Sequence, residues 1–266
     1  MINKLDREAL REQFRTAQPF PFVAIDNFLD PEFAKEVAAA YPSFETAQAQ
    51  GFGFNFVNEQ KKFQITDQGK FPGPVRRLSD AISSPQFLAD LEYITGIPRL
   101  LADDQLAGGG MHLTGPGGRL DVHVDFHLLE ERKLFRRLNI LLYLNPVWRE
   151  EWGGHIELWD KDVKVCHFRS IPLLNRCVIF ETSDISYHGV FPVGPSAECV
   201  RQSFAAYYYT LEPPPGWSEF HSTVFRARPN EKLRGFLYMP LEKTWQRVSR
   251  RVDQVKSWAK ARIRPG

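Results

Sequence analysis

The stretch of sequence that decides the fold is DVHVDF, residues 121–126, in which polar and apolar side chains alternate with a period of two. Successive side chains of a β-strand point to opposite faces, so we expect His123 and Asp125 on one face and the apolar side chains on the other. An imidazole and a carboxylate at this spacing can bind one metal ion, and a second imidazole would complete a 2-His-1-carboxylate site. The pair alone is weak support for such a site, because it often occurs by chance.

A second imidazole and an arginine follow at a spacing that strengthens the metal hypothesis. His188 ends a strand-like run 63 residues beyond Asp125, and Arg201 begins another strand 13 residues later. Arg201 and Ser203 would share a face of that strand, and a guanidinium beside a hydroxyl suits a carboxylate in a confined pocket. The sequence therefore predicts a metal site close to a carboxylate-binding site.

The strand predicted for residues 136–144 separates two kinds of side chain. One face is wholly apolar, and the other carries Arg137, Asn139 and Tyr143 together with a leucine. A central strand with polar groups on its second face implies a polar-lined interior, which a cofactor pocket requires. By the same count Arg136 lies outside that face, and we expect it in solvent.

Short strand-like runs separated by glycine, proline and asparagine turns fill the second half of the chain. Runs at this spacing favour a jelly-roll or barrel over a parallel α/β sheet. The predicted fold is mainly β with supporting helices: a jelly-roll (cupin-like) core packed by N-terminal helices. The predicted strands are residues 110–114, 120–126, 136–144, 154–159, 163–168, 175–181 and 199–210.

The chain divides into a core with three appendages of the same domain. Residues 1–107 form a helical and mixed support region, in which Asp30 and Pro31 open a helix and residues 44–70 are loop-rich. Residues 108–212 form the strand-rich core, and residues 213–240 are a loop-rich extension. A basic amphipathic helix is predicted at residues 241–266, which carry eight lysines and arginines against two acids. Its apolar stripe would pack on the chain itself or in a homodimer, although such helices also bind membranes and acidic partners.

Composition narrows the class of protein further. A net charge of +2 gives no reason to expect a nucleic-acid partner, and the amino terminus lacks the apolar run of a signal peptide. No apolar run approaches the roughly 18 residues that a transmembrane helix needs. Cys166, Cys177 and Cys199 lie in apolar runs and are expected to be buried thiols of a reduced compartment. We therefore expect a soluble, cytoplasmic protein.

The order and spacing of His123, Asp125, His188 and Arg201 resemble the iron(II)- and 2-oxoglutarate-dependent dioxygenase superfamily, in particular its prolyl-hydroxylase-like branch. The run from Tyr143 to Trp159, YLNPVWREEWGGHIELW, is similar to a strand–turn–strand segment of that branch. The resemblance covers roughly residues 108–210 and implies a double-stranded β-helix. It also implies iron(II) as the metal, with 2-oxoglutarate and dioxygen as cosubstrates and ascorbate as a stimulant.

The resemblance assigns roles to particular residues. It implies that His123, Asp125 and His188 are the catalytic metal ligands. It also implies cofactor-binding residues around the distal carboxylate of 2-oxoglutarate. These are Arg201, which would form the salt bridge, Ser203 and Tyr143, which would assist it, and His112, which stands where relatives often have a tyrosine.

The expected reaction is hydroxylation of an unactivated C–H bond, with a prolyl or similar residue of a protein or peptide as the first choice of substrate. A small-molecule substrate, such as an amino acid, sugar or secondary metabolite, is the alternative. A non-catalytic jelly-roll module that binds metal or 2-oxoglutarate also stands as a hypothesis. The sequence does not identify the hydroxylated position. Substrate contacts are predicted for His127, Arg137 and Asn139, and His155-x-Glu157 is read as a chance metal-like pair.

Overall fold

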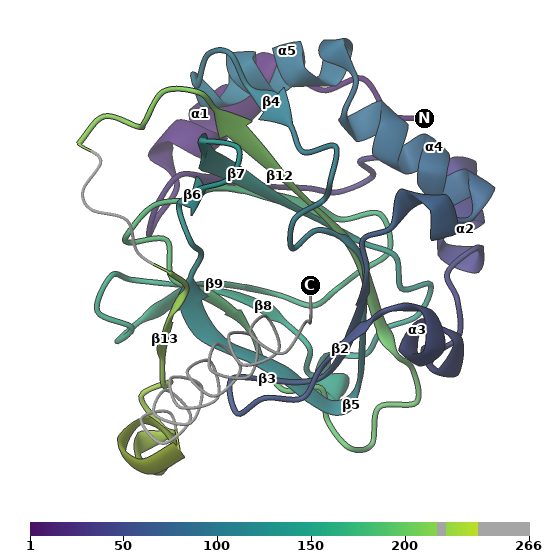
Figure 1. Cartoon of the computed structure of the whole chain (residues 1–266), viewed down its shortest axis with the longest axis vertical. Coiled ribbons are helices and arrows are strands. Elements are labelled where there is room, and N and C mark those ends of the chain that lie inside the picture. The colour runs from purple at the N-terminus through teal and green to yellow at the C-terminus, as the bar shows by residue number, and fades with distance from the viewer. Residues whose placement is uncertain (217–221, 239–266) are drawn as a thin grey trace, which may run out of the picture.

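The computed structural model describes residues 1–216 and 222–238. Its strands form one curled antiparallel sheet, along which the order is β1-β10-β7-β12-β5-β11-β8-β9, and α-helices cover one side of it (Figure 1). The mainly β prediction is confirmed. The strands are β1 (Phe22–Ile25), β2 (Phe52–Phe54), β3 (Glu59–Ile65), β4 (Leu101–Ala102), β5 (Gly110–Val124), β6 (Leu128–Leu129), β7 (Leu134–Tyr143), β8 (Ile156–Trp159), β9 (Cys166–Ser170), β10 (Cys177–Glu181), β11 (His188–Val190), β12 (Arg201–Thr210) and β13 (Val224–Arg226).

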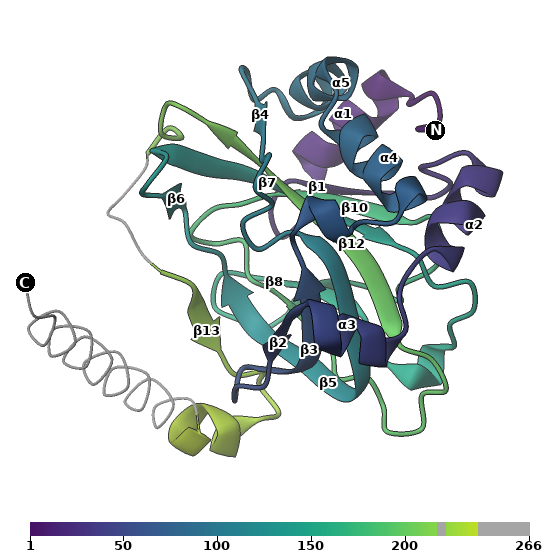
Figure 2. The ribbon, with the colours of Figure 1, turned by 45° about the vertical axis from the view of Figure 1, so that its right-hand side comes forward.

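The helices form a layer on the outer face of the sheet (Figure 2). The apolar face predicted for β7 does point outward to them: Leu138, Ile140 and Leu142 belong to one buried cluster with side chains of every long helix. The Asp30 cap is confirmed, since its carboxylate accepts hydrogen bonds from the first backbone N–H groups of α2. The helices are α1 (Arg7–Thr16), α2 (Pro31–Ala39), α3 (Phe44–Gln50), α4 (Gly73–Ile82) and α5 (Pro85–Thr95), with short turns η1 (Gln68–Lys70), η2 (Glu150–Trp152) and η3 (Arg234–Tyr238).

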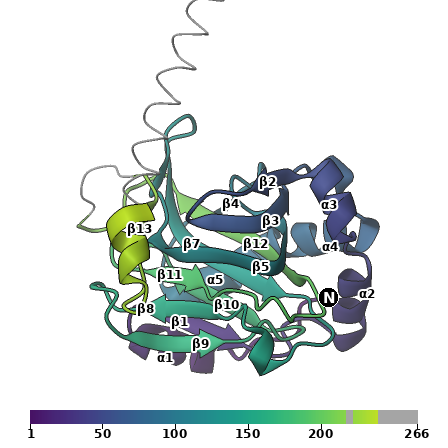
Figure 3. The ribbon, with the colours of Figure 1, turned by 90° about the horizontal axis from the view of Figure 1, so that it is seen from below.

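Strand β5 joins the two halves of the curled sheet. Its first half pairs with β12, its second half pairs with β11 and β13, and β3 pairs with residues of both halves. Seen from below, β2 and β3 run along one side of the molecule and β8 and β9 along the opposite side (Figure 3). The interior of the curl therefore lies between these two sides, and β5 contributes side chains to it along its whole length.

Two predictions about local structure were wrong. Residues 44–70 are not loop-rich, because they contain α3, β2 and β3. Two separate strands were expected at 110–114 and 120–126, but β5 continues through the glycine-rich segment between them. Pairing with β3 is kept on both sides of a register shift, so the glycines are absorbed as an irregularity within the strand and no turn ends it.

The predicted basic helix at 241–266 lies outside the described residues, as does part of the 213–240 extension. Among the residues that are described, no helix combines the length and the apolar content that a membrane span requires.

Candidate active site

The three predicted metal ligands meet inside the curl. His123 lies near the end of β5 and Asp125 directly follows that strand, whereas His188 begins β11 and is the direct register partner of His123. The Nε2 atom of His123 lies 3.5 Å from Oδ1 of Asp125, and Nε2 of His188 lies 3.8 Å from Oδ2. One nitrogen or oxygen atom from each residue falls within a 4.8 Å cluster, and all three side chains are buried. Within the described part of the chain this is the one cluster of its kind.

Backbone carbonyls fix both imidazoles in the orientation that a metal ligand needs. Nδ1 of His123 donates to the carbonyl of Asp121 at 2.9 Å, and Nδ1 of His188 donates to the carbonyl of Ser186 at 2.9 Å. Because a carbonyl can only accept, each Nδ1 carries a proton, and each Nε2, which faces Asp125, is the ring atom left to bind a metal. Oδ2 of Asp125 is buried without a hydrogen-bond partner. This donor set fits a divalent transition-metal ion such as iron(II).

The electrostatics of the cluster agree with that fit. Burial and the neighbouring His123 lower the pKa of His188 to about 4, so its imidazole is neutral at physiological pH. Burial alone would raise the pKa of Asp125, but Arg136 and the two imidazoles outweigh it and hold that pKa well below its usual range. The cluster therefore offers the neutral imidazole of His188 beside the ionised carboxylate of Asp125, which are the protonation states that metal binding requires of these two residues.

A second polar group lies deeper in the curl and is built around Arg201. The Arg201 side chain is 3% exposed, its Nε donates to the carbonyl of Gly154 at 2.8 Å, and its Nη1 donates to Ser203 Oγ at 3.3 Å. Its Nη2 has no partner, and neither does the hydroxyl of Tyr143, whose ring centroid is 5.0 Å from the guanidinium carbon. A buried cation with a spare donor beside a spare hydroxyl fits a carboxylate of 2-oxoglutarate.

His112 lies on β5 next to the polar group around Arg201, because its register partner on the neighbouring strand β12 is Ser203. Its Nε2 is buried without a hydrogen bond. Burial, followed by the charges of Lys62 and Arg201, lowers the pKa of His112 well below its ordinary value. His112 is therefore neutral and faces a group that includes the unpartnered donor of Arg201.

Two cavities adjoin the metal cluster on different sides. An inner cavity of 50 Å³ is lined by His188, Arg201 and Ser203 among others, and an outer cavity of 260 Å³ is lined by His123 and Asp125. Lys62, Leu120 and Tyr207 line both cavities, so the two adjoin. The metal cluster thus lies between a small space that the buried Arg201 also lines and a larger space with aromatic walls.

The prediction that Arg136 lies in solvent was wrong. Its side chain is 2% exposed, and its Nη1 lies 3.3 Å from Oδ2 of Asp125. The reason is a β-bulge: Tyr208 pairs with Leu138, but Tyr209 pairs with Arg136, so the register skips one residue of β7. One extra residue reverses the face of every side chain beyond it, and Arg136 therefore turns into the interior.

The three predicted substrate contacts lie in different places. Asn139 lines the inner cavity, and its Oδ1 is buried without a partner. His127 lies beyond the end of β5, lines a third cavity of 610 Å³, and has its Nε2 2.7 Å from a carboxylate oxygen of Asp184. Arg137, the bulged residue, lies beside Glu181 and Thr210. The structure thus brings only Asn139 next to the predicted cofactor-binding residues.

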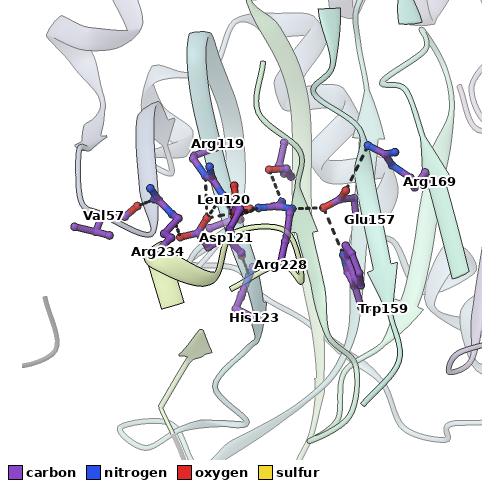
Figure 4. A network of polar contacts seen from close by, with 12 residues as sticks. Val57, Arg119, Leu120, Asp121, His123, Glu157, Trp159, Arg169, Arg228 and Arg234 are labelled. Atoms are coloured by element: carbon purple, nitrogen blue, oxygen red, sulfur yellow. Dashed lines mark hydrogen bonds and ion pairs between the residues drawn. The ribbon is translucent and has the colours of Figure 1, made fainter. Parts of the chain in front are cut away.

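The His155-x-Glu157 pair does not form a second ligand set. The Nε2 atom of His155 lies 2.8 Å from a carboxylate oxygen of Glu150, whereas Glu157 points into a network of charged side chains behind β5 (Figure 4). Arg228 connects this network, because its guanidinium lies 2.7 Å from Glu157 and 3.5 Å from the fully buried Asp121. Two further guanidiniums, those of Arg119 and Arg234, also pair with Asp121.

This network attaches the segment after residue 221 to the metal-ligand strand. Strand β13 pairs with β5 directly alongside the ligands, and the ring of Phe225 lies 5.3 Å from the ring of His123. Sequence reasoning did not find this contact, because nothing in the composition of residues 222–238 marks them as part of the site. Asp121 gave the available signal, since it precedes the two ligands on the same predicted strand and a buried carboxylate there needs cationic partners.

Comparison with known proteins agrees with this geometry. Residues 109–209 match the profile of the 2OG-Fe(II) oxygenase superfamily. Mouse (Mus musculus) prolyl 3-hydroxylase OGFOD1 is 37% identical over 90 residues, which are 32% of this chain and 16% of that protein. Prolyl 3,4-dihydroxylase OGFOD1 of Ostreococcus tauri is 25% identical over 213 residues, or 73% of this chain and 38% of that protein. The chain therefore spans less than half the length of either curated relative.

The fold has solved counterparts as well. One is a prolyl hydroxylase from Trichoplax adhaerens, solved in complex with a peptide fragment of the hypoxia inducible factor oxygen degradation domain. It superposes with a TM-score of 0.55 at 19% sequence identity, and the match covers 76% of this chain and 88% of that one. Residues 109–209 are therefore similar to the 2OG-Fe(II) oxygenase superfamily, and the chain shares the double-stranded β-helix fold of the solved prolyl hydroxylase. Iron(II) and 2-oxoglutarate are the cofactor and cosubstrate of that class, and the domain resembles prolyl hydroxylases.

Proposed function

We propose that the protein is an iron(II)- and 2-oxoglutarate-dependent oxygenase that hydroxylates a prolyl or similar residue of a protein or peptide. The observation that carries the proposal is that His188, one member of the His123–Asp125–His188 cluster, and the buried Arg201 line the same inner cavity. A metal cluster alone would suit many reactions. A buried cation with an unpartnered donor at the far end of the cavity specifies an anionic cosubstrate.

In this proposal each of the three cluster residues supplies one atom that binds the iron. The Nε2 atoms of His123 and His188 and a carboxylate oxygen of Asp125 would hold the iron, and the carbonyls of Asp121 and Ser186 keep both imidazoles in the required tautomer. When bound, iron(II) and 2-oxoglutarate supply the oxidative chemistry that places hydroxyl on an unactivated C–H bond. The protein positions that bond and excludes water.

The far end of the inner cavity would hold the distal carboxylate of 2-oxoglutarate. Arg201 supplies the charge, and Ser203 and Tyr143 supply hydroxyls. Burial raises the pKa of Tyr143 to about 12, so its hydroxyl keeps its proton and can donate it to a carboxylate oxygen. Burial keeps His112 neutral, and because its other ring nitrogen donates to backbone carbonyls of Gly108 and Gly109, its free Nε2 can accept a hydrogen bond but cannot donate one to the carboxylate.

A peptide substrate is favoured by the spaces outside the metal cluster. The outer cavity of 260 Å³ and the third cavity of 610 Å³ both have Arg136 in their walls, and together they offer more room than a single small metabolite would fill. Phe54, Phe56 and Phe225 line the outer cavity. Aromatic faces suit the apolar ring of a prolyl residue. The prolyl hydroxylase relatives support the same substrate class.

We also propose a cytoplasmic location. The cysteines Cys166, Cys177 and Cys199 are all free, and burial raises the pKa of the Cys177 thiol. Inert thiols that form no disulfide agree with a reduced compartment. The homodimer suggested by the stripe at 241–266 stays a prediction, because those residues lie outside the described chain.

The activity is tested by turnover without substrate. Purified protein with iron(II), ascorbate and 2-oxoglutarate should release succinate slowly, and the His123→Ala variant should release none. The matched control is His167→Ala, since His167 lies on β9 away from the cluster. If the wild type neither binds nor consumes 2-oxoglutarate and His123→Ala behaves like it, the enzyme assignment is refuted.

The substrate class is tested by a screen for a +16 mass change. Proline-containing peptides and a panel of amino acids, sugars and secondary metabolites should be incubated separately with the reconstituted protein. We expect 2-oxoglutarate consumption coupled to a peptide. Coupling to a small molecule alone would contradict the peptide assignment while leaving the oxygenase assignment intact.

A further inference from the structure

Arg136 is the fully buried cation nearest to the proposed metal ligands. Its guanidinium lies between two aromatic rings, with the central carbon 3.8 Å from the Phe126 centroid and 3.7 Å from the Tyr207 centroid. Burying a guanidinium without a partner is costly, and aromatic faces cover its two flat sides. Arg136 is therefore held in one plane, and only its edge can interact with polar groups.

That edge is directed at one oxygen of the metal-ligand carboxylate. Nη1 lies 3.3 Å from Asp125 Oδ2, while Nη2 lies 3.4 Å from both the Ala107 carbonyl and the Tyr209 hydroxyl. The other oxygen, Asp125 Oδ1, lies 3.5 Å from Nε2 of His123. Oδ2 also lies 3.8 Å from Nε2 of His188, so each oxygen faces one imidazole, but only Oδ2 forms an ion pair with the guanidinium.

We propose that Arg136 is a positioning residue that makes Asp125 a single-oxygen ligand. A carboxylate can bind a metal through one oxygen or through two. Two imidazoles and one oxygen leave three positions of an octahedral ion open, as a chelating cosubstrate and dioxygen together require. Two carboxylate oxygens would leave only two positions. This inference rests on the proposed metal site and adds the residue that sets how many positions that site leaves open.

The β-bulge in β7 is the structural device that brings Arg136 to this place. Without the skipped residue, the side chain would point toward the helices, because strand faces alternate. Lysine would not be equivalent here. Its ammonium keeps the charge but has no planar group to fit between the rings of Phe126 and Tyr207.

The test measures binding of Co(II), a spectroscopic substitute for iron(II), by competition with a chelator. Arg136→Met should weaken Co(II) binding by about 10- to 100-fold, which is the usual cost of losing a partner of a metal ligand. Its visible Co(II) absorption should become weaker, because a second carboxylate oxygen raises the coordination number. Arg136→Lys should recover part of the affinity. A purely structural role would change neither the spectrum nor the order of the two variants.

The matched control is Arg132→Met. Arg132 also pairs with a buried carboxylate, that of Asp103 at 3.0 Å, but Asp103 is not one of the proposed ligands. This control should bind Co(II) with wild-type affinity and spectrum. If Arg136→Met does not fold, Phe126→Leu replaces it. That variant removes one ring and keeps the charge, and it should weaken Co(II) binding several-fold.

Two results would overturn the inference. The first is a folded Arg136→Met, or Phe126→Leu in its place, with unchanged affinity and spectrum. The second is tighter Co(II) binding by Arg136→Met, because Arg136 would then act mainly by repelling the metal. His123→Ala separates this failure from failure of the proposed function. If His123→Ala still binds Co(II) like the wild type, the metal site itself is wrong; if it loses binding, only the role of Arg136 is refuted.

Discussion

Replacing Arg201 with methionine should weaken 2-oxoglutarate binding strongly and metal binding hardly at all. Arg201 is the buried cation at the far end of the inner cavity, and its Nη2 has no partner there. Its other donors are occupied by the carbonyl of Gly154 and the hydroxyl of Ser203. Methionine fills a similar volume, so the change removes the charge and the donors while limiting the loss of packing.

The size of the effect follows from the burial of the pair. Truncating one partner of a buried charge pair costs about 2–5 kcal/mol. Because Ser203 and Tyr143 would still offer hydroxyls to the carboxylate, we take about 3 kcal/mol. At 1.4 kcal/mol for each factor of ten, this corresponds to a dissociation constant for 2-oxoglutarate about 150-fold higher. Ser203→Ala removes one neutral hydrogen bond, about 0.5–1.5 kcal/mol, and should raise it by about two- to tenfold.

The assay is a calorimetric titration of 2-oxoglutarate into Co(II)-loaded protein, with Co(II) affinity measured separately. Among the described residues, Arg201 makes no hydrogen bond or ion pair with the three proposed ligands, so Co(II) affinity should stay within about threefold. The reasoning is refuted if the folded Arg201→Met variant binds 2-oxoglutarate within about fivefold of the wild type. Equal loss of metal and 2-oxoglutarate would instead mean that Arg201 is structural.

Three further predictions concern stability. Arg228→Met should lower the free energy of unfolding, measured by urea titration, by about 3 kcal/mol, which is the low end for breaking a buried pair. The loss is limited because Asp121 keeps two other arginines, whereas Glu157 keeps only the half-exposed Arg169. A loss under about 1 kcal/mol would contradict this prediction. Burial lowers the pKa of His112 in the folded chain, so the unfolded chain binds a proton at a higher pH than the folded chain does. Metal-free protein should therefore lose stability as the pH falls below about 6.5, and His112→Leu should weaken that pH dependence. A gain in stability of the wild type over the same pH range would refute the prediction. Co(II) at 100 times its dissociation constant should add about 2.7 kcal/mol to the stability of the wild type and nothing to His123→Ala, which thermal melts would show.

The sequence predicted the chemistry of the site better than its surroundings. The alternation in residues 121–126 and the sequence spacing to His188 and Arg201 can be read directly from the sequence. A strand keeps its side-chain faces over a few residues, whatever packs on it. The outward apolar face of β7 was predictable for the same reason, since period-two patterning records which side meets the helices. The strands β2 and β3 were missed, because a polar sequence with glycines pairs with β5 through backbone hydrogen bonds that composition does not encode.

The sequence by itself determined a mainly β fold, a metal-binding pair on one strand face, and the partners that complete it. Only the tertiary structure decided what surrounds that pair. The bulge in β7 turned Arg136 from an expected surface side chain into a neighbour of Asp125, and β13 brought Phe225 against His123 from about a hundred residues away. The physical reason is the same in both cases. Register and strand order are set by backbone pairing between distant segments, and a slip of one residue changes which side chain reaches the site without changing the pattern that the sequence shows.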